Sequence, residues 1–473
     1  MSSLIQPLEP GQEGFLRDES RRRGMAESIA FPKSEAEVIA VIREADGELT
    51  IQGARTGVAA SAVPQGGTLL NLSRMNRIGD VRERTVTVEP GALLSDIRER
   101  VGAQDLFFPP DPTEDSASIG GMAACNASGA CSFSYGPTRN WINALRVVLA
   151  DGSVLNLKRG GQKADAQMIT EALRSYTMPN VKNAAGYFVR DDMDLIDLFI
   201  GAEGTLGVIT ELELKLLEKP ASVVGFMVFQ PSEKAALEFV RILRESDPKP
   251  VAIEYFNPDA LDLLRTADFA EFPKMKPHFY AAVYLEFHNA DPSEFVFETM
   301  TALGVGEDDC WFAEGEKELE PLKAFRHATP EAVNLLIDER RKENPELTKL
   351  GTDMSVPDSE LEAVMELYNE GLKAAKLESV IFGHIGNNHL HVNILPRNMA
   401  EYEKGKQLYS FWADQVVAMG GSVSAEHGIG KIKVPLLKKM VGPEGVAAMR
   451  QIKKTFDPEE RLNRGTLFEM ENR

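Results

Sequence analysis

The chain of 473 residues is 43% hydrophobic and 26% charged, which is typical of a globular protein with two or three domains. Its formal net charge of −20 argues against a nucleic-acid partner, because no long basic stripe offsets the acidic side chains. The three cysteines, Cys125, Cys131 and Cys310, have no CxxC spacing, which excludes a zinc knuckle or an iron–sulfur cluster held by this chain alone.

The N-terminal stretch has no apolar h-region, and no apolar run approaches the length of a membrane span. Few cysteines in so long a chain fit a reducing compartment. We therefore expect a cytoplasmic protein without an integral membrane segment, for which binding at the membrane periphery stays open.

The segment 31–89 predicts alternating helices and strands. Ser34 and Glu37 have the spacing of a capping box before the helical run EVIAVIREA. The short runs LTIQG, TLLNL and TVTVE predict strands, and residues 91–101 predict a helix. Residues 105–140 are rich in Pro, Gly, Ser and Asn with little periodicity, which predicts a loop that wraps a ligand.

The run NALRVVLADGSVLNL predicts a hairpin, because Asp151-Gly152 separates two segments rich in strand-forming residues. A long strand follows in GAEGTLGVITELELKLLEK, and Pro220 marks an expected domain boundary. Beyond it, VVGFMVF, VAIEYF and HFYAAVYLEFH predict strands that alternate with helices such as SEKAALEFVRILRES. This order predicts a separate α+β domain on an antiparallel sheet, and residues 432–456 predict a closing helix.

Four of the seven histidines lie in two short windows, FGHIGNNHLHVNIL and SAEHGIGK. On an extended strand His389, His391 and Asn393 share one face, while the apolar residues between them face the other way. His384 can fold back over that face across a Gly-Asn-Asn turn, and Glu426 and His427 form a second Gly-bounded stretch. Imidazole and carboxylate together are what a divalent metal and a proton-accepting base require, so the pattern predicts a metal or catalytic site.

Three glycine-rich loops in the first half, 53–57, 118–121 and 201–207, indicate a nucleotide or dinucleotide, because glycines let backbone N–H groups approach a phosphate. None matches G-x-G-x-x-G or G-x-x-x-x-G-K-[ST], so neither a Rossmann NAD site nor a P-loop is supported.

These motifs carry a resemblance. PPDPTEDSASIGGMAACNASG, YGPTRNWINALRVVLADG and GAEGTLGVITELELKL resemble the FAD-binding domain of the vanillyl-alcohol oxidase / p-cresol methylhydroxylase superfamily. FGHIGNNHLHVNIL, SAEHGIG and DPEERLNRG resemble its FAD-linked 2-hydroxy-acid dehydrogenases, a branch that includes D-lactate dehydrogenases, glycolate oxidase catalytic subunits and D-2-hydroxyglutarate dehydrogenases.

The resemblance implies an α+β fold with a two-part FAD-binding domain of the p-cresol methylhydroxylase type. We expect this domain at 1–220, an α+β cap domain with an antiparallel sheet that binds the substrate at 221–425, and a C-terminal segment returning to the FAD domain at 426–473.

The resemblance also implies the residues that bind FAD. Those of the pyrophosphate loop are Gly53, Ala54, Arg55, Thr56 and Gly57. Those along the isoalloxazine and ribityl path are Pro110, Asp111, Ser118, Gly120, Gly121, Asn126, Gly129, Tyr135 and Gly136. Those at the adenosine end are Glu203, Gly207 and Ile209, and Asn463 would return to the flavin ring.

The chain departs from the family pattern at two places. Arg464 stands where the family usually has Pro, and Gly386-Asn387-Asn388-His389 stands where it usually has G-D-G-N, which makes His389 an extra candidate ligand. No histidine precedes His278, so a histidyl-flavin link from the first half of the FAD domain cannot form. We expect noncovalent FAD, with Cys125 and Cys131 as structural or incidental thiols.

The implied reaction is the oxidation of a small D-2-hydroxy acid to the 2-oxo acid, with hydride transfer to flavin N5. His427 is the implied base, and Arg326 is the implied partner of the substrate carboxylate. His384, His391, Asn393 and Glu426 are the implied ligands or near ligands of a divalent metal; their N and O donors suit Zn, Mn or Fe. Gly351 stands where relatives that oxidise 2-hydroxyglutarate have lysine, and Lys349 is out of register, which favours lactate, glycolate or a similar acid.

Two other functions stay open: a noncatalytic FAD-binding electron-transfer subunit of a larger complex, and a metal-dependent hydrolase without flavin. Since the chain encodes no second redox centre, we expect electrons to pass to an external acceptor. Its acidic surface favours a soluble redox protein, either an iron–sulfur subunit or an electron-transferring flavoprotein. A homodimer is also compatible with the sequence.

Overall fold

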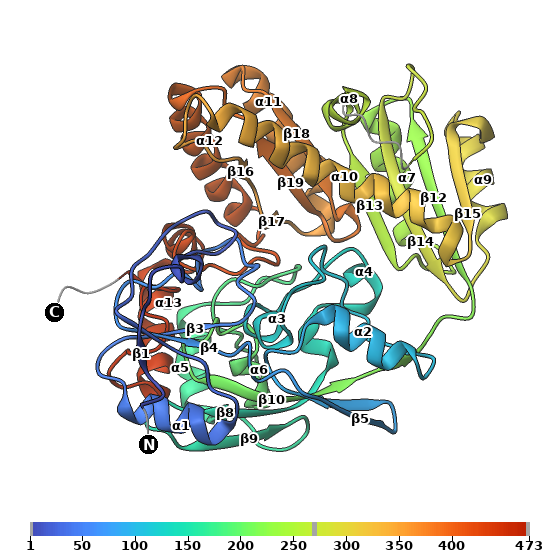
Figure 1. Cartoon of the computed structure of the whole chain (residues 1–473). Helices are drawn as coiled ribbons and strands as arrows, with labels where there is room; N and C mark the ends of the chain where they lie inside the picture. Colours follow the sequence, from blue (N-terminus) through green and yellow to red (C-terminus); the bar gives the residue numbers. More distant parts are fainter. Residues whose placement is uncertain (1–2, 267–271, 470–473) are drawn as a thin grey trace.

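The computed structural model describes residues 3–266 and 272–469 and contains a lower body joined to an upper domain (Figure 1). The first sheet of the lower body has the order β1-β2-β4-β3, with parallel pairing of β4 to both β2 and β3. Its elements are Gln6–Pro7 (β1), Ser28–Ala30 (β2), Leu49–Gln52 (β3), Thr68–Asn71 (β4), the helix Glu35–Glu44 (α1) and the 3-10 turn Glu13–Leu16 (η1). The predicted helix start is confirmed, because Ser34 Oγ accepts a hydrogen bond from the Glu37 backbone N–H at 3.3 Å.

The second sheet of the lower body is antiparallel and has the order β5-β6-β10-β8-β9. Its strands are Ile78–Arg82 (β5), Thr85–Val88 (β6), Ile142–Val148 (β8), Val154–Lys158 (β9) and Val208–Lys215 (β10). The hairpin predicted around Asp151-Gly152 is confirmed by the β8–β9 pairing. The helices nearby are Leu94–Gly102 (α2), Ala166–Ser175 (α5) and Ile196–Phe199 (α6).

The segment 105–140 is more ordered than its composition predicts. It contains Leu106–Phe107 (β7), which pairs with Leu217–Glu218 (β11), and the helices Ile119–Cys125 (α3) and Ser132–Tyr135 (α4), followed by the turn Thr138–Trp141 (η2). The expectation of little regular structure here was wrong, because α3 is buried by contacts with β10 and η2 that local periodicity does not reveal. That the segment wraps a ligand stays a prediction.

The upper domain has one large antiparallel sheet, as predicted, with the order β15-β12-β14-β13-β18-β19-β16, while β17 pairs with β19. The strands are Val223–Gln230 (β12), Ala252–Phe256 (β13), Ala281–His288 (β14), Cys310–Glu314 (β15), Leu350–Gly351 (β16), Met354–Ser355 (β17), Ser379–Gly383 (β18) and His389–Ile394 (β19).

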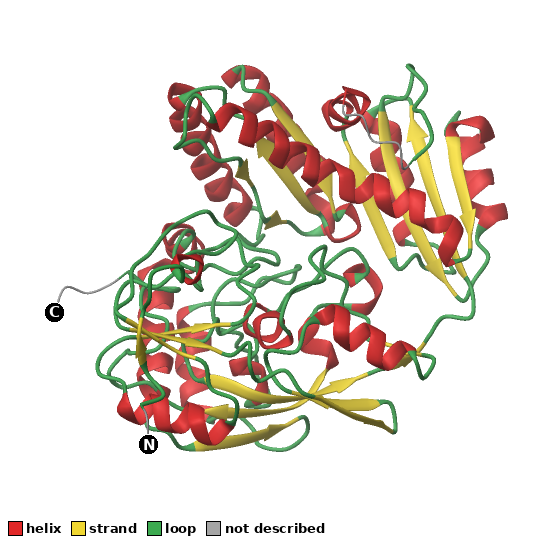
Figure 2. Cartoon of the chain, in the orientation of Figure 1, coloured by secondary structure: helices red, strands yellow, loops and turns green. Residues whose placement is uncertain are grey.

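Helices lie against both faces of this sheet (Figure 2). They are Glu233–Arg244 (α7), Pro258–Thr266 (α8), Ser293–Ala302 (α9), Glu316–Arg341 (α10), Leu361–Ala375 (α11) and Met399–Ala418 (α12), with 3-10 turns at Glu307–Asp309 (η3), Asp358–Glu360 (η4) and Ile385–Asn387 (η5). Phe226 packs in one apolar cluster with Phe239, while its neighbour Met227 packs in another with Phe325. Burial on both faces explains why β12 reads as an unbroken apolar run.

The C-terminal segment returns to the lower body, where the helix Val434–Phe456 (α13) contacts α5 (Figure 1). Beyond α13, Leu462 forms a bridge with Leu49, and the Asn463 backbone N–H donates to the Leu49 carbonyl at 2.9 Å. No helix in the described part of the chain is both long and apolar enough to span a bilayer.

A buried ion pair fixes this return. Lys453 Nζ lies 2.8 Å from Asp457 Oδ2, and the same carboxylate accepts from the backbone N–H groups of Arg461 and Leu462. We expect Asp457→Ala to lower the free energy of unfolding by about 3–5 kcal/mol, because it leaves a buried ammonium without its counterion. Urea denaturation measures the change, and Asp414→Ala is the control, since its surface pair with Lys439 contributes at most about 1 kcal/mol. An equal decrease in the free energy of unfolding of the two variants would contradict the prediction.

Candidate functional site

A cavity of about 1150 Å³ runs from the glycine loops of the lower body to the histidine strand of the upper domain. The predicted residues that line it are Gly53, Ala54, Arg55, Thr56, Gly57, Ser118, Gly120, Gly121, Glu203, Gly207, Ile209, Arg326, His384, His391, Asn393, Glu426, His427 and Asn463. Residues far apart in sequence therefore share one chamber that is large enough for an extended cofactor and a small substrate.

The first glycine loop follows β3 and packs directly on the second. A Cβ atom at Gly53 would lie 2.1 Å from Ser118 Oγ, so only glycine fits this close approach. The Ala54 backbone N–H donates to the same hydroxyl at 3.2 Å, while nothing lies within 4 Å of a Cβ built at Gly57. The loop is thus held at one end and open to the cavity at the other, which fits the binding of a phosphate-containing cofactor.

Glu203 and Asn463 join the C-terminal segment to this wall. The Glu203 carboxylate accepts from Ser61 Oγ at 2.5 Å and from the backbone N–H groups of Ile429 and Gly430 at 2.8 Å each. Asn463 accepts from the Ile51 N–H at 2.7 Å and donates to the Glu203 carbonyl at 2.6 Å. Burial raises the pKa of Glu203, and these donors oppose the shift.

Six residues predicted along the flavin path are not among those that line the cavity: Pro110, Asp111, Asn126, Gly129, Tyr135 and Gly136. Asn126 caps α3 and accepts from the Arg139 N–H at 3.0 Å. Tyr135 hydrogen-bonds His288 at 2.7 Å, and Asp111 pairs with Arg98 at 2.7 Å. Their contacts are with protein, so a direct role at the cofactor stays a prediction for these six.

The histidine windows converge on one point. His384, His389, His391 and Glu426 each offer one ligand atom, and these atoms all lie within 4.8 Å of one another. The hairpin of β18 and β19 brings the three imidazoles together, as the strand alternation predicts, and the 422–428 segment supplies the carboxylate.

The outward ring nitrogens of two histidines are held by acceptors. His384 Nδ1 lies 2.7 Å from Glu254 Oε1, and His391 Nδ1 lies 3.0 Å from the Thr352 carbonyl oxygen. Their Nε2 atoms face Glu426 Oε1 at 3.4 and 3.7 Å. Metal-binding histidines show this two-sided arrangement, in which an outer acceptor fixes the ring and the inner nitrogen points at the ion. The donor set therefore fits a divalent cation.

The second carboxylate oxygen of Glu426, Oε2, is fixed by two donors. This oxygen accepts from Lys182 Nζ at 2.7 Å and from Ser128 Oγ at 3.0 Å. Burial alone would raise the pKa of Glu426, but its neighbours, the charge of Lys182 first among them, hold it well below its usual range. The carboxylate is thus ionised, as a metal ligand must be.

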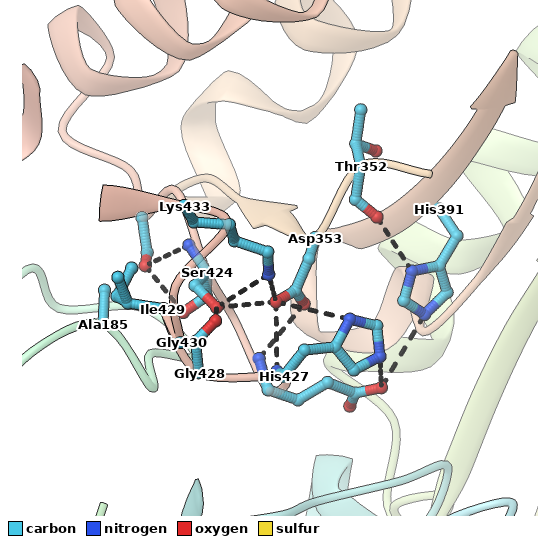
Figure 3. A network of polar contacts seen from close by, with 12 residues as sticks. Ala185, Thr352, Asp353, His391, Ser424, His427, Gly428, Ile429, Gly430 and Lys433 are labelled. Carbon is cyan, nitrogen blue, oxygen red and sulfur yellow. Dashed lines mark hydrogen bonds and ion pairs between the residues drawn. The ribbon is translucent and has the colours of Figure 1, made fainter. Parts of the chain in front are cut away.

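Asp353 organises the loop that carries His427 (Figure 3). This buried carboxylate accepts from the backbone N–H groups of Glu426 and His427 at 3.1 and 3.0 Å, and from Ser424 and Lys433 at 2.7 and 2.6 Å. Burial would raise the pKa of Asp353, but its charged neighbours, Lys433 among them, bring it well below the usual value. The loop is therefore fixed before any ligand binds.

His427 presents its imidazole to the cavity, with 33% of the side chain exposed. Its Nε2 lies 3.6 Å from Glu426 Oε1, and its ring stacks on that of His391 with centres 5.5 Å apart. Burial lowers the pKa of His427 although Asp353 opposes the shift. The ring is thus neutral at physiological pH and accessible, as a proton-accepting base requires.

Arg326 and Asn393 complete the predicted set. Arg326, on α10, lies 3.6 Å from Asp111 and donates to His327 Nε2 at 2.8 Å, so its guanidinium is already held at the cavity wall. Asn393 donates through Nδ2 to the His391 carbonyl at 3.3 Å and lies beside Gly351. Burial and then the positive charge of Arg326 lower the pKa of His327 to about 4.

Residues 219–467 match the family described as FAD linked oxidases, C-terminal domain, and residues 26–158 match the FAD binding domain. The first match alone covers more than half of the chain. The chain belongs to the FAD-linked oxidases. Its cofactor is accordingly FAD.

Relatives of this FAD-linked oxidase align over most of its length. The D-lactate dehydrogenase of Anaerostipes hadrus is 30% identical and covers 96% of this chain and 92% of that protein. The glycolate oxidase subunit GlcD of Bacillus subtilis (strain 168) is 28% identical over 94% of this chain and 90% of its own length. The D-2-hydroxyglutarate dehydrogenase of Xanthomonas citri pv. viticola is 31% identical over 93% of this chain and 89% of its own length.

A solved structure of alkyldihydroxyacetonephosphate synthase superposes with a TM-score of 0.69 and covers 98% of this chain and 83% of that chain. At 16% identity the likeness shows the fold alone. It confirms the predicted architecture, an FAD-binding body of the p-cresol methylhydroxylase type with an α+β domain on an antiparallel sheet.

Sequence reasoning missed three residues of the FAD-linked oxidase site: Lys182, Glu254 and Asp353. Glu254 lies on β13, in the apolar run VAIEYF, where a lone buried carboxylate was the available signal. Asp353 and Lys182 lie in irregular stretches, so their convergence on the 424–427 loop depends on tertiary structure alone. The three cysteines form no disulfide within residues 3–266 and 272–469.

Proposed function

We propose that this FAD-linked oxidase oxidises a small D-2-hydroxy acid to the 2-oxo acid and passes the electrons to an external acceptor. Its relatives are named as a glycolate oxidase subunit, a D-lactate dehydrogenase and a D-2-hydroxyglutarate dehydrogenase, and the family matches supply the FAD. The observation that carries the proposal is the single cavity, which joins the glycine loops to His427, Arg326 and the histidine cluster.

Three side chains have roles in this reaction. His427 accepts the hydroxyl proton, because it is neutral and exposed to the cavity. Arg326 binds the substrate carboxylate, a task to which the planar guanidinium is suited. Asp353 keeps the His427 loop in position, so that the base needs no rearrangement.

FAD, when bound, supplies the acceptor for the hydride that leaves the substrate Cα, and we propose that it is bound noncovalently. His384, His391 and Glu426 would hold a divalent cation such as Zn, Mn or Fe, with Asn393 beside them, and a cation there would polarise the hydroxyl and carboxylate oxygens. The cation also offsets the charge of an acidic protein that must bind an anion.

Anaerobic bleaching of the flavin by a panel of D- and L-2-hydroxy acids tests the proposal. We expect yellow protein whose absorption falls with a D-2-hydroxy acid and stays unchanged with the L enantiomer. A yellow protein that none of these acids bleaches would favour a noncatalytic electron-transfer subunit. A colourless protein that cannot be reconstituted with FAD would favour a metal-dependent hydrolase.

A dicarboxylic 2-hydroxy acid is a second candidate substrate. Lys349 is out of register in the sequence, but its place in the cavity wall favours this candidate. This lysine lines the cavity just before β16 and has no hydrogen-bond or ion-pair partner among the described residues. Burial and then the nearby Arg21 lower the pKa of Lys349 to about 8, so the ammonium lacks a counterion that a second carboxylate would supply.

For this second candidate, we expect Lys349→Met to lower kcat/KM for a dicarboxylic acid about 10-fold to 100-fold and to leave D-lactate nearly unchanged, since one charged hydrogen bond contributes about 1.5–3 kcal/mol. Steady-state kinetics with both acids measure the ratio. An equal decrease in kcat/KM for both acids would favour the monocarboxylic substrate.

The electron acceptor is proposed to be a soluble redox protein, an iron–sulfur subunit or an electron-transferring flavoprotein, at a cytoplasmic location. The relative GlcD is named as a subunit, which supports assembly with further chains. We expect stopped-flow mixing of substrate-reduced enzyme with air to reoxidise the flavin more slowly than steady-state turnover with the partner. Reoxidation by air at the turnover rate would make the protein an oxidase and the partner unnecessary.

A further inference from the structure

We propose that His389 is a direct ligand of the cation, so that three imidazoles and one carboxylate of this chain hold it. The inference rests on the proposed function, in which His384, His391 and Glu426 bind the ion. It adds a fourth protein ligand at a position where the sequence departs from its family.

The first support is the burial of His389. The side chain is 0% exposed, and neither Nδ1 nor Nε2 has a hydrogen-bond partner in the described parts of the chain. Of the two nitrogens, Nδ1 is the one that faces the other ligand candidates, at 3.8 Å from Glu426 Oε2. A buried polar atom without a partner is rare in folded proteins, and a bound ion accounts for it.

The second support is that His389 repeats the two-sided arrangement of its neighbours. Its other nitrogen, Nε2, lies 3.0 Å from Asp353 Oδ1, as the outer nitrogen of His384 lies beside Glu254 and that of His391 beside the Thr352 carbonyl. Each of the three rings therefore has an oxygen atom within 3.0 Å on its outer side and a nitrogen directed at Glu426 on its inner side, although the contact of His389 with Asp353 lacks hydrogen-bond geometry. Such outer partners orient metal-binding histidines.

The third support is the spacing of the rings. Three imidazoles bound to one ion at about 2.1 Å, at angles of roughly 90–110°, have ring centres about 4.5–5.3 Å apart. The observed distances between ring centres are 4.5 Å for His389 and His391, 5.3 Å for His384 and His389, and 5.7 Å for His384 and His391. One ion can therefore contact all three with small shifts.

A structural role for His389 is the competing explanation. The ring could fill space beside Asp353, whose Oδ1 lies 3.0 Å from Nε2. Space filling accounts for the Asp353 contact but not for the inward Nδ1 or for the convergence of three rings on one carboxylate.

Four protein ligands narrow the choice of ion. If the hydroxyl and carboxylate oxygens of a 2-hydroxy acid also bind, the ion must accept six ligands. Zinc in proteins usually keeps four and expands to five, whereas iron accepts imidazole and carboxylate ligands at higher coordination number. The site thus favours Fe(II) or a similar ion over Zn(II).

X-ray absorption spectroscopy on the FAD-containing full chain, reconstituted with Co(II), tests the inference because it counts bound imidazoles. We expect three in the wild type, two in His389→Asn, and three in the control His278→Asn, whose ring lies on the surface. Competition with a chelator should show Co(II) affinity at least about 10-fold to 100-fold weaker in His389→Asn alone.

Two imidazoles in the wild type, or the same count in the wild type and His389→Asn, would overturn the inference, as would wild-type protein that binds no Co(II). If His389→Asn does not fold, the wild-type count decides by itself. The proposed function fails separately, when no 2-hydroxy acid bleaches the flavin. A protein that is bleached and holds Co(II) through two imidazoles would keep the function and lose only this inference.

Discussion

Replacing His427 with alanine should slow flavin reduction by about two to four orders of magnitude, the usual contribution of a positioned base. His427 presents a neutral imidazole to the cavity, and its backbone is held by Asp353 through a 3.0 Å hydrogen bond. Since that bond involves the backbone N–H, the variant keeps the loop, the FAD and the carboxylate of Glu426. Anaerobic stopped-flow mixing with a D-2-hydroxy acid measures the rate directly.

A pH profile separates the loss of a base from general damage at the site. A histidine base works only when deprotonated, so wild-type reduction should fall as the pH drops below the pKa of His427. Because burial lowers that pKa, the fall should occur below the ordinary value of about 6.5. The variant should lack this acid limb. Reduction at the wild-type rate in His427→Ala would remove the residue from the mechanism.

Local patterns in the sequence predicted the elements that carry the site. The hairpin at Asp151-Gly152, the helix start at Ser34 and the strands of the upper domain follow from turn chemistry, capping and periodicity, which act over a few residues. The alternation of His389 and His391 on β19 likewise predicted a shared face, and their ring centres lie 4.5 Å apart. Because these features depend on a few neighbouring residues, they can be predicted from a single sequence.

The polar shell around the cluster was not predictable in this way. Glu254, Asp353 and Lys182 reach the histidines and Glu426 from three different segments, over sequence separations of 130, 36 and 244 residues respectively. No local rule links such distant positions. The helices α3 and α4 in segment 105–140 were missed for the same reason, because tertiary burial stabilises them against a loop-like composition.

Replacing His391 with alanine should lower the metal content and the rate of flavin reduction together, while the FAD spectrum survives. The ring contributes Nε2 toward Glu426 Oε1 at 3.7 Å and is fixed by the Thr352 carbonyl, so its removal opens the ligand set. Loss even of an outer partner costs about 10-fold to 100-fold in metal affinity, and loss of a ligand should cost at least as much. Elemental analysis and the visible spectrum of the same sample measure both effects.

His278→Ala is the matched control, because it removes an exposed imidazole that pairs with Asp309 and lies outside the cavity lining. This variant should keep both the metal content and the rate of flavin reduction of the wild type. Within the described residues, no hydrogen bond, ion pair or ring contact joins His391 to the glycine loops proposed to bind FAD, so a loss of FAD in His391→Ala would point to unfolding rather than to a ligand role. Full metal occupancy in a folded, yellow His391→Ala would contradict the assignment of this residue, and the cation would then have to be held by Glu426 with the remaining histidines.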